Sequence, residues 1–322
     1  MPARYIRNTA VLAKIESTYG IDPTPTEGAN AFLVSNIGIE PLNATNVDRD
    51  LVRPYMGNSE QLVGTAYIGL TFDVEIAGSG TAGTAPAYSA LLRACGFAET
   101  STGGVRTEYN PVTPVADSVS IYWFSDGVKH IAKGCRGNFL IKMGVSGRPV
   151  FAFSFQGIDG GVTAASPSAL TLTAFKTPSV ISDANTGDVT LGCTYTAATP
   201  TLTGGTGYPS QGLEMDIGNA VNYTPLLGGE TVDISQRSVT GSLVLDLTAA
   251  QEVTFMATVK ANTTQAMGLM HGTTAGYKAM LFMPSVQILN PKKVDVNGKL
   301  MIGFDFRAVP SSGNDELKIV VH

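Results

Sequence analysis

The feature that most constrains the fold of this chain is a series of short strand-like runs separated by tight-turn signals. Asp126-Gly127 and Asn297-Gly298 each separate two runs rich in β-branched and aromatic residues. Such dipeptides tolerate the positive φ angles of two-residue hairpin turns. The run from Phe72 to Ile76 alternates apolar and polar residues, as a strand with one buried face does. The chain is therefore predicted to be mainly antiparallel β.

Two stretches have the spacing of amphipathic helices. Residues 84–96 offer Thr84 as a cap and Gly96 as a stop, and residues 248–262 show a similar pattern. Each is a single helix among strands, so we expect it to cover a face or an end of a sheet. The apolar positions of the two faces are Tyr88, Leu91, Leu92 and Cys95 in the first, and Val253, Met256 and Val259 in the second.

The chain also shows signs of an internal repeat. Residues 146–155 and 297–306 both have a turn glycine, then a basic residue, then two phenylalanines at matching positions. Weaker matches pair 37–40 with 217–220 and 69–73 with 241–245, in the same order along the chain. The sequence therefore predicts two tandem copies of one β-rich domain, with chance similarity among strands as the alternative.

The repeat sets the expected domain boundaries. The first domain covers residues 1–165 and includes an N-terminal arm and a long loop at 43–65, and the second covers 208–322. Residues 166–207 between them are rich in Thr and Gly, and we interpret them as a linker with strand-like pieces or as an exposed decorated edge. The strand-like pieces are 169–175 and 188–195.

Composition excludes several classes of protein. Charged residues make up 15% of the 322 residues, against about 25% in a usual soluble domain, and the net charge is −5. An acidic chain does not suit a nucleic-acid binder that works through a basic patch. No apolar run is long enough for a membrane helix, and the N-terminus has no signal-peptide pattern. The low charge is consistent with surface that another subunit covers.

Enzyme motifs are weak. Residues 78–83 match the glycine spacing of a dinucleotide-binding loop, but the strand before them alternates polar and apolar residues instead of being continuously apolar. Residues 183–188 resemble the start of a calcium loop, but Thr194 stands where the bidentate Glu belongs. The three histidines have no partners at metal-ligand spacing, and the cysteines Cys95, Cys135 and Cys193 form no CxxC pair. We therefore expect no catalytic site, metal or cofactor.

The long loop is the strongest candidate site. It combines both signs of charge with large apolar side chains, a mixture that suits a protein contact. A loop that folds back on its own domain is the alternative. A shorter counterpart lies at residues 231–238. The candidate contact residues are Asp48, Arg49, Asp50, Leu51, Val52, Arg53, Tyr55 and Met56.

Three segments resemble a known family. Residues 46–55 (NVDRDLVRPY), 72–97 (FDVEIAGSGTAGTAPAYSALLRACGF) and 14–25 are similar to the major tail tube proteins of long, non-contractile-tailed bacteriophages, the siphophage major tail proteins. The similarity is best over about residues 10–160, and the second half follows through the repeat. It implies two tandem tail-tube-type antiparallel β-sandwich or barrel domains, each with one flanking α-helix.

The resemblance also implies a structural, non-enzymatic virion protein that forms rings. The rings would stack into a viral tail tube that conducts DNA, with the long loop contacting the next ring. Single-domain relatives form hexameric rings, so the duplication favours a trimer with pseudo-six-fold symmetry, with a hexamer as the alternative. Asp73 and Glu75 are candidate lumen-facing acidic residues, because an acidic lumen lets DNA slide.

Its expected partners follow from that family. They are other copies of itself, a tape measure protein inside the tube, terminator and distal tail proteins at the ends, and DNA that passes non-specifically during ejection, without a membrane. The expected location is the virion tail, after synthesis and assembly in the bacterial cytoplasm. The alternatives are another virion subunit, such as a capsid decoration or baseplate protein, and a dinucleotide-binding enzyme.

Overall fold

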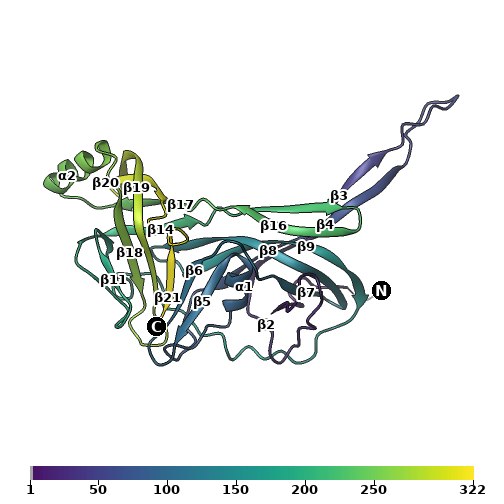
Figure 1. The fold of residues 1–322 in the computed structure, drawn as a ribbon, viewed down its shortest axis with the longest axis horizontal. Coiled ribbons are helices and arrows are strands. Elements are labelled where there is room, and N and C mark those ends of the chain that lie inside the picture. The colour runs from purple at the N-terminus through teal and green to yellow at the C-terminus, as the bar shows by residue number, and fades with distance from the viewer. Residues whose placement is uncertain (1–2) are drawn as a thin grey trace.

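The computed structural model describes residues 3–322, which form an elongated, mainly antiparallel β protein with two helices in that range (Figure 1). The predicted mainly β class with antiparallel sheets is confirmed. The first half contains β1 Thr9–Ile15, β2 Ala31–Phe32, β3 Ser35–Asp48, β4 Gln61–Glu75, α1 Ser89–Ala94, β5 Phe97–Thr102, β6 Arg106–Pro111, β7 Val119–Ser125, β8 Val128–Gly144 and β9 Val150–Ala164. The second contains β10 Val189–Leu191, β11 Thr194–Thr196, β12 Thr201–Thr203, β13 Thr206–Tyr208, β14 Ser210–Asp216, β15 Ala220–Leu226, β16 Gly229–Gln236, β17 Thr240–Leu245, α2 Ala249–Lys260, β18 Gln265–His271, β19 Ala279–Val296, β20 Lys299–Ala308 and β21 Lys318–Val321.

The two halves have the same strand order. In the first half, β3 pairs with β4, β4 with β9, and β9 with β8. In the second, β14 pairs with β17, β17 with β20, and β20 with β19. β7 also corresponds to β18, because β7 precedes and pairs with β8, and β18 precedes and pairs with β19. We call β3-β4-β9-β8 and β14-β17-β20-β19 the first and second four-strand units.

The two units are joined edge to edge within the chain. The end of β8 pairs with β14 in antiparallel register, from Leu140 opposite Asp216 to Gly144 opposite Gly212. A second connection forms where β21 pairs with both β19 and β6. Eight strands therefore lie in a continuous row from β3 to β19.

The predicted hairpin turns are confirmed. Asp126 and Gly127 have φ angles of 41° and 87°, and β7 and β8 flank them. Asn297 and Gly298 have φ angles of 54° and 84° between β19 and β20. Both pairs adopt the left-handed conformation that a tight hairpin requires.

The helices differ in detail from the prediction. Helix α1 begins at Ser89 and not near Thr84, because residues 84–88 form turns around a proline before the helix. Helix α2 begins with the capping box of Thr248 and Gln251. Its buried residue is Phe255, which the predicted face omitted, and Val253 is 72% exposed. Since α2 has few contacts beyond β19 and β20, most of its surface faces solvent.

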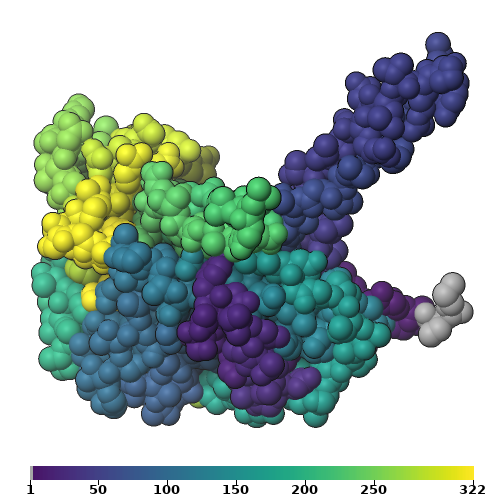
Figure 2. Space-filling model, turned by 45° about the vertical axis from the view of Figure 1, so that its right-hand side comes forward, coloured from purple at the N-terminus to yellow at the C-terminus, as the bar shows by residue number. Residues whose placement is uncertain are grey.

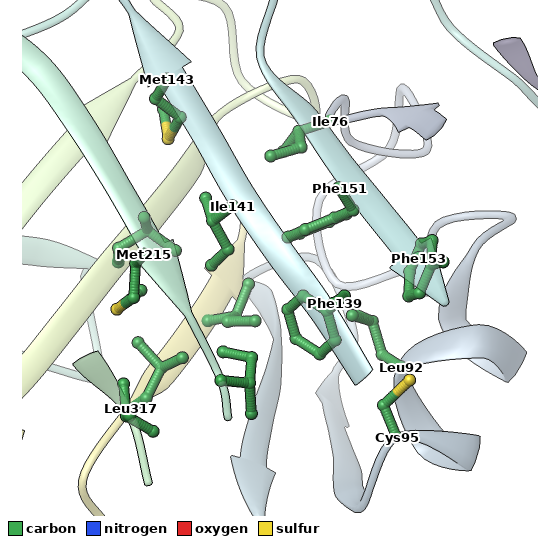
Figure 3. Close-up of a cluster of buried hydrophobic side chains, with 14 of the residues drawn as sticks. Ile76, Leu92, Cys95, Phe139, Ile141, Met143, Phe151, Phe153, Met215 and Leu317 are labelled. Atoms are coloured by element: carbon green, nitrogen blue, oxygen red, sulfur yellow. The ribbon is translucent and has the colours of Figure 1, made fainter. Parts of the chain in front are cut away.

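One hydrophobic core spans both halves. Phe139 and Ile141 of β8 lie between Phe151 of β9 on one side and Met215 of β14 and Leu317 near β21 on the other, within one cluster of buried side chains (Figure 3). All five side chains are almost fully buried. Burial of this kind contributes about 1.5–3 kcal/mol for each large apolar side chain, so the core holds the two units in one relative position.

The segment between the halves is only partly irregular. Residues 169–175 form no strand, contrary to the prediction, because they lie in an extended connection with few backbone partners. The predicted piece at 188–195 corresponds to β10 and the start of β11. Since β10 pairs with β18, this stretch extends the sheet of the second half.

Two hairpins leave the row of strands. The outer parts of β3 and β4, residues 41–67, form a long projection that we call the arm (Figures 1 and 2). Strands β15 and β16 form a second hairpin, which lies across β8 and β9 (Figure 1). Each hairpin connects the first two strands of its own four-strand unit.

Candidate functional site

The predicted contact loop is the outer end of the arm. Strand pairing continues to Asp48 opposite Gln61, so residues 49–60 are a loop and the two flanking parts of the predicted loop at 43–65 are paired strands. The eight predicted contact residues all lie at this end, and Figure 2 shows it projecting away from the body. The alternative in which the loop folds back on its own domain is therefore wrong.

The arm tip is apolar and charged at the same time. The side chains of Val52 and Met56 are fully exposed, at 103% each. Arg53 forms an ion pair with Glu60 at 3.2 Å, and Arg49 pairs with the same carboxylate. These pairs hold the two sides of the tip together and leave the apolar side chains facing solvent. Exposed apolar groups surrounded by charges are typical of a protein contact.

The β15–β16 hairpin is bound to the first half by specific hydrogen bonds. The amide of Asn219 donates to the carbonyl oxygens of Cys95 at 2.8 Å and Gly137 at 3.0 Å. The guanidinium of Arg136 donates to the Val232 carbonyl at 3.0 Å and pairs with Asp233. These bonds satisfy groups that are buried or half-buried, so the hairpin is a fixed part of the body.

Asp73 and Glu75 lie on the polar face of the sheet, opposite the buried Phe72 and Val74. Asp73 accepts a 2.6 Å hydrogen bond from the amide of Asn36, and Glu75 pairs with Arg148 at 3.1 Å. Further charged side chains face the same way along the row. By strand register they are Glu40, Glu214, Asp216 and Asp305 with Lys142, Lys292 and Arg307. With Asp73, Glu75 and Arg148 included, the face is polar and carries six carboxylates and four cations.

The glycine-rich loop has a packing role. It lies between β4 and α1, and the N–H of Gly80 donates to the Gly276 carbonyl at 3.0 Å. A Cβ on Gly78 would collide with the same carbonyl. Gly83 adopts a φ of 73° against the backbone of residues 102–104. These glycines let a loop of the first half meet a loop of the second at backbone distance.

A charged cluster also connects the halves. Glu108 on β6 accepts hydrogen bonds from Tyr195 at 2.5 Å, Arg106 at 2.6 Å and Lys318 at 3.1 Å. Burial alone would raise the pKa of Glu108, but these hydrogen bonds outweigh it and lower that pKa. The carboxylate therefore stays ionised and links β6 to β11 and β21.

Other reactive groups are confined to the core. Burial raises the pKa of the Cys95 and Cys135 thiols well above their ordinary value. No group of three or more His, Cys, Asp or Glu residues within 3–322 is placed to hold a metal ion. In the same range, no helix has both the length and the apolar character needed to cross a bilayer.

One correspondence was missed by sequence reasoning. The predicted match of residues 37–40 with 217–220 is out by four positions, because strand register aligns Ile39 with Met215. In this alignment Asn43-Ala44-Thr45-Asn46 falls on Asn219-Ala220-Val221-Asn222. The shared Asn-Ala-Xaa-Asn pattern was the available signal, and it marks the base of both hairpins.

Together these features define a mainly antiparallel β protein with a projecting arm and partly unpaired edge strands, which is typical of subunits that join through their sheets. Residues 6–308 match the family model of the phage tail tube protein, and the chain belongs to this family. It is a structural protein of the virion tail. A comparison with curated proteins gives no match.

Proposed function

We propose that the two halves are tandem copies of one tail tube domain and that three chains close into a ring with pseudo-six-fold symmetry. Stacked rings form the tube through which phage DNA passes to the host. The observation that supports this proposal most directly is the pairing of β8 with β14 inside the chain, over Leu140–Gly144 and Gly212–Asp216. It joins one four-strand unit to the next in the way that chains must join in a ring.

The joint between chains follows from the internal joint. β3 corresponds to β14, and within residues 3–322 its only partner is β4. β19 corresponds to β8, and its stretch 287–296 pairs only with β20 in that same range. In the ring, β3 of one chain pairs with this stretch of the next chain. Glu40 on β3 and Lys292 on β19 carry opposite charges at the edges that would meet.

The polar face of the continuous row supports the role of a conduit. In a closed ring this face lines the lumen, and it carries Asp73, Glu75 and the other carboxylates described above. Because DNA is densely negative, a wall with more carboxylates than cations binds it weakly and lets it slide. A tape measure protein occupies the same space before DNA does.

The arm tip supplies contacts in the assembled tail. Residues Asp48 to Met56 present the apolar and charged side chains that contact an adjacent ring. Terminator and distal tail proteins meet the end rings of the tube. Synthesis and assembly take place in the host cytoplasm.

The test is the symmetry and joint of the assembled particle. End-on averaging of tubes formed by the purified protein is expected to give three-fold symmetry with six similar lobes. Glu40→Lys or Lys292→Glu alone is expected to prevent ring closure, and the double exchange is expected to restore it. A protein that forms only small discrete oligomers, or rings with six chains, contradicts the proposal.

A further inference from the structure

The polar face of the first half has a hollow that the β15–β16 hairpin closes on one side. Its floor includes Thr71 of β4 and Ser154 and Gln156 of β9. Asn219 and Val221, at the base of the hairpin, form its wall. Asn219 is fixed there by the carbonyls of Cys95 and Gly137, so the wall is a permanent part of this half.

The second half has the corresponding hollow without the wall. Its floor includes Ser242 of β17 and Asp305 and Arg307 of β20. Strand register makes these residues equivalent to the first set, because Thr71 lies opposite Ser154 in one unit and Ser242 lies opposite Asp305 in the other. No hairpin of this chain crosses the second hollow in the range 3–322.

The residues that correspond to the wall belong to the arm. Asn43 and Thr45 fall on Asn219 and Val221 in the shared Asn-Ala-Xaa-Asn pattern. Among the described residues the Asn43 amide donates to two side chains of β3 and β4, to Tyr67 at 2.9 Å and Glu40 at 3.2 Å. Thr45 is exposed, and on one side it and Asn43 line a hollow next to the β15–β16 hairpin of the same chain. The base of the arm thus carries the residues that correspond to Asn219 and Val221, and within residues 3–322 the second hollow has no such residues beside it.

From this geometry we infer that the base of the arm, residues 43–46, packs into the second hollow of an adjacent copy in the same ring. The Asn43 amide then donates to the main-chain carbonyl of Ile288, which is the register equivalent of Gly137. The occupant is a second copy of this chain, because the β15–β16 hairpin already shows how such a segment fits such a floor. The inference rests on the proposed ring, and it places the base of the arm within a ring while the tip remains free for other contacts.

Cysteine cross-linking tests the contact directly. Val221 and Gln156 line the same hollow beside the hairpin. Val221 corresponds to Thr45 in the shared pattern, and Gln156 corresponds to Arg307 by strand register. The pair expected to meet between chains is therefore Thr45 and Arg307. Assembled Thr45→Cys/Arg307→Cys protein is expected to give reducible dimers and trimers under mild oxidation. The three native cysteines are buried, so they leave the background low. The matched pair Val221→Cys/Gln156→Cys is expected to give a bridge inside one chain, without dimers.

A negative control separates specific from random linkage. Val52→Cys/Arg307→Cys places the first thiol at the arm tip and is expected to give no dimers within isolated rings. Equal dimer yield from the Val52 and Thr45 pairs overturns the inference. Rings that form normally but give no Thr45–Arg307 link also overturn it and leave the proposed function intact. Absence of rings in the unmodified protein overturns both.

A second variant needs no cross-link. Asn43→Leu removes the amide of a half-buried side chain, and within the monomer it costs the hydrogen bonds to Tyr67 and Glu40. We expect the protein concentration for half-maximal ring formation to rise about tenfold or more, with a melting temperature lower by no more than a few degrees, since each lost hydrogen bond in a buried contact changes association about tenfold. Ring formation at the unmodified concentration overturns the inference.

Discussion

The arm and the β15–β16 hairpin occupy the same position in their four-strand units, yet one projects freely and the other lies flat. The hairpin lies flat because the first unit is next to it in the chain and offers Gly137 and Arg136 as partners. The arm has no unit on that side, so its apolar residues stay exposed. In this chain, the hairpin that lies flat is the one with a four-strand unit beneath it.

Shortening each hairpin gives the largest expected contrast. Replacing residues 46–63 with an Asn-Gly turn is expected to abolish assembly while leaving urea unfolding of the monomer nearly unchanged, because within residues 3–322 the strand pairs and ion pairs of the removed segment lie inside the arm itself. Replacing residues 223–232 in the same way is expected to lower the free energy of unfolding by several kcal/mol, since Arg136 loses its carbonyl partner. Light scattering and urea titration measure the two effects. Equal loss of monomer stability in both variants would contradict the comparison.

Single asparagine changes sharpen the same contrast. Asn219→Leu is expected to lower the free energy of unfolding by about 1–3 kcal/mol, because two buried carbonyls lose their donor. The matched Asn43→Leu change is expected to cost less, about 0.5–1 kcal/mol, because the half-buried Asn43 loses only side-chain partners, Tyr67 and Glu40, that lie next to solvent. Urea unfolding at constant protein concentration, below the ring-forming range, compares the two. A similar cost at both positions would show that the arm is already anchored in the monomer.

A charge reversal at the tip separates stacking from ring closure. Arg53→Glu breaks an exposed ion pair with Glu60 and adds repulsion, at a cost to monomer stability of under about 1 kcal/mol. It is expected to leave rings intact and to block their stacking into tubes. Negative-stain images count rings and tubes, and Arg53→Lys serves as the control. Tubes of normal length from Arg53→Glu would remove the tip from the stacking contact.

The smallest expected effect concerns acid stability of the second half. His271 is buried on β18, its Nδ1 lies 2.8 Å from the Thr186 hydroxyl, and its Nε2 has no partner. Burial lowers the pKa of His271 below its ordinary value of about 6.5. The neutral ring therefore contributes stability that is present above pH 6.5 and is lost as the pH falls toward the folded-state pKa.

The measurement is the melting temperature of the monomer between pH 7.5 and pH 5. The unmodified protein is expected to lose a few degrees more than His271→Gln over this interval, because glutamine cannot take up the proton. Identical pH profiles for the two proteins would contradict the role of His271. Carboxylates titrate in both proteins, so the difference between them isolates the histidine.

Local signals in the sequence predicted local structure well. Asp126-Gly127 and Asn297-Gly298 form the expected turns because their preference for positive φ acts within two residues. The cap of α2 formed at Thr248 for the same reason. The face of α2 was wrong at Val253 because periodicity finds an apolar stripe but not which sheet lies beneath it.

The place of the candidate segment was predicted, but its surroundings were not, and its role as a contact stays a prediction. Composition predicted Asp48 to Met56 as a contact segment in a long loop, and the structure shows that strand pairing extends along the arm as far as Asp48. Bulges in β3 disturb the alternation that marks a strand, so a loop was predicted. The same bulges hid the match between Asn43 and Asn219. The glycines at 78–83 matched the spacing of a dinucleotide-binding loop, because glycine is required both where a backbone approaches a cofactor and where it approaches another loop, as it does here.

The internal joint between β8 and β14 has a kinetic consequence. Every joint made inside a chain forms during folding and needs no encounter between molecules, because its two edges are held at a high effective concentration. In the proposed ring, three molecules therefore have to meet where separate domains would require six. Assembly should begin at lower protein concentration and with fewer incomplete rings. Each free chain also exposes one pair of open edges in place of two, which limits the surface available for wrong pairing before the tube is built.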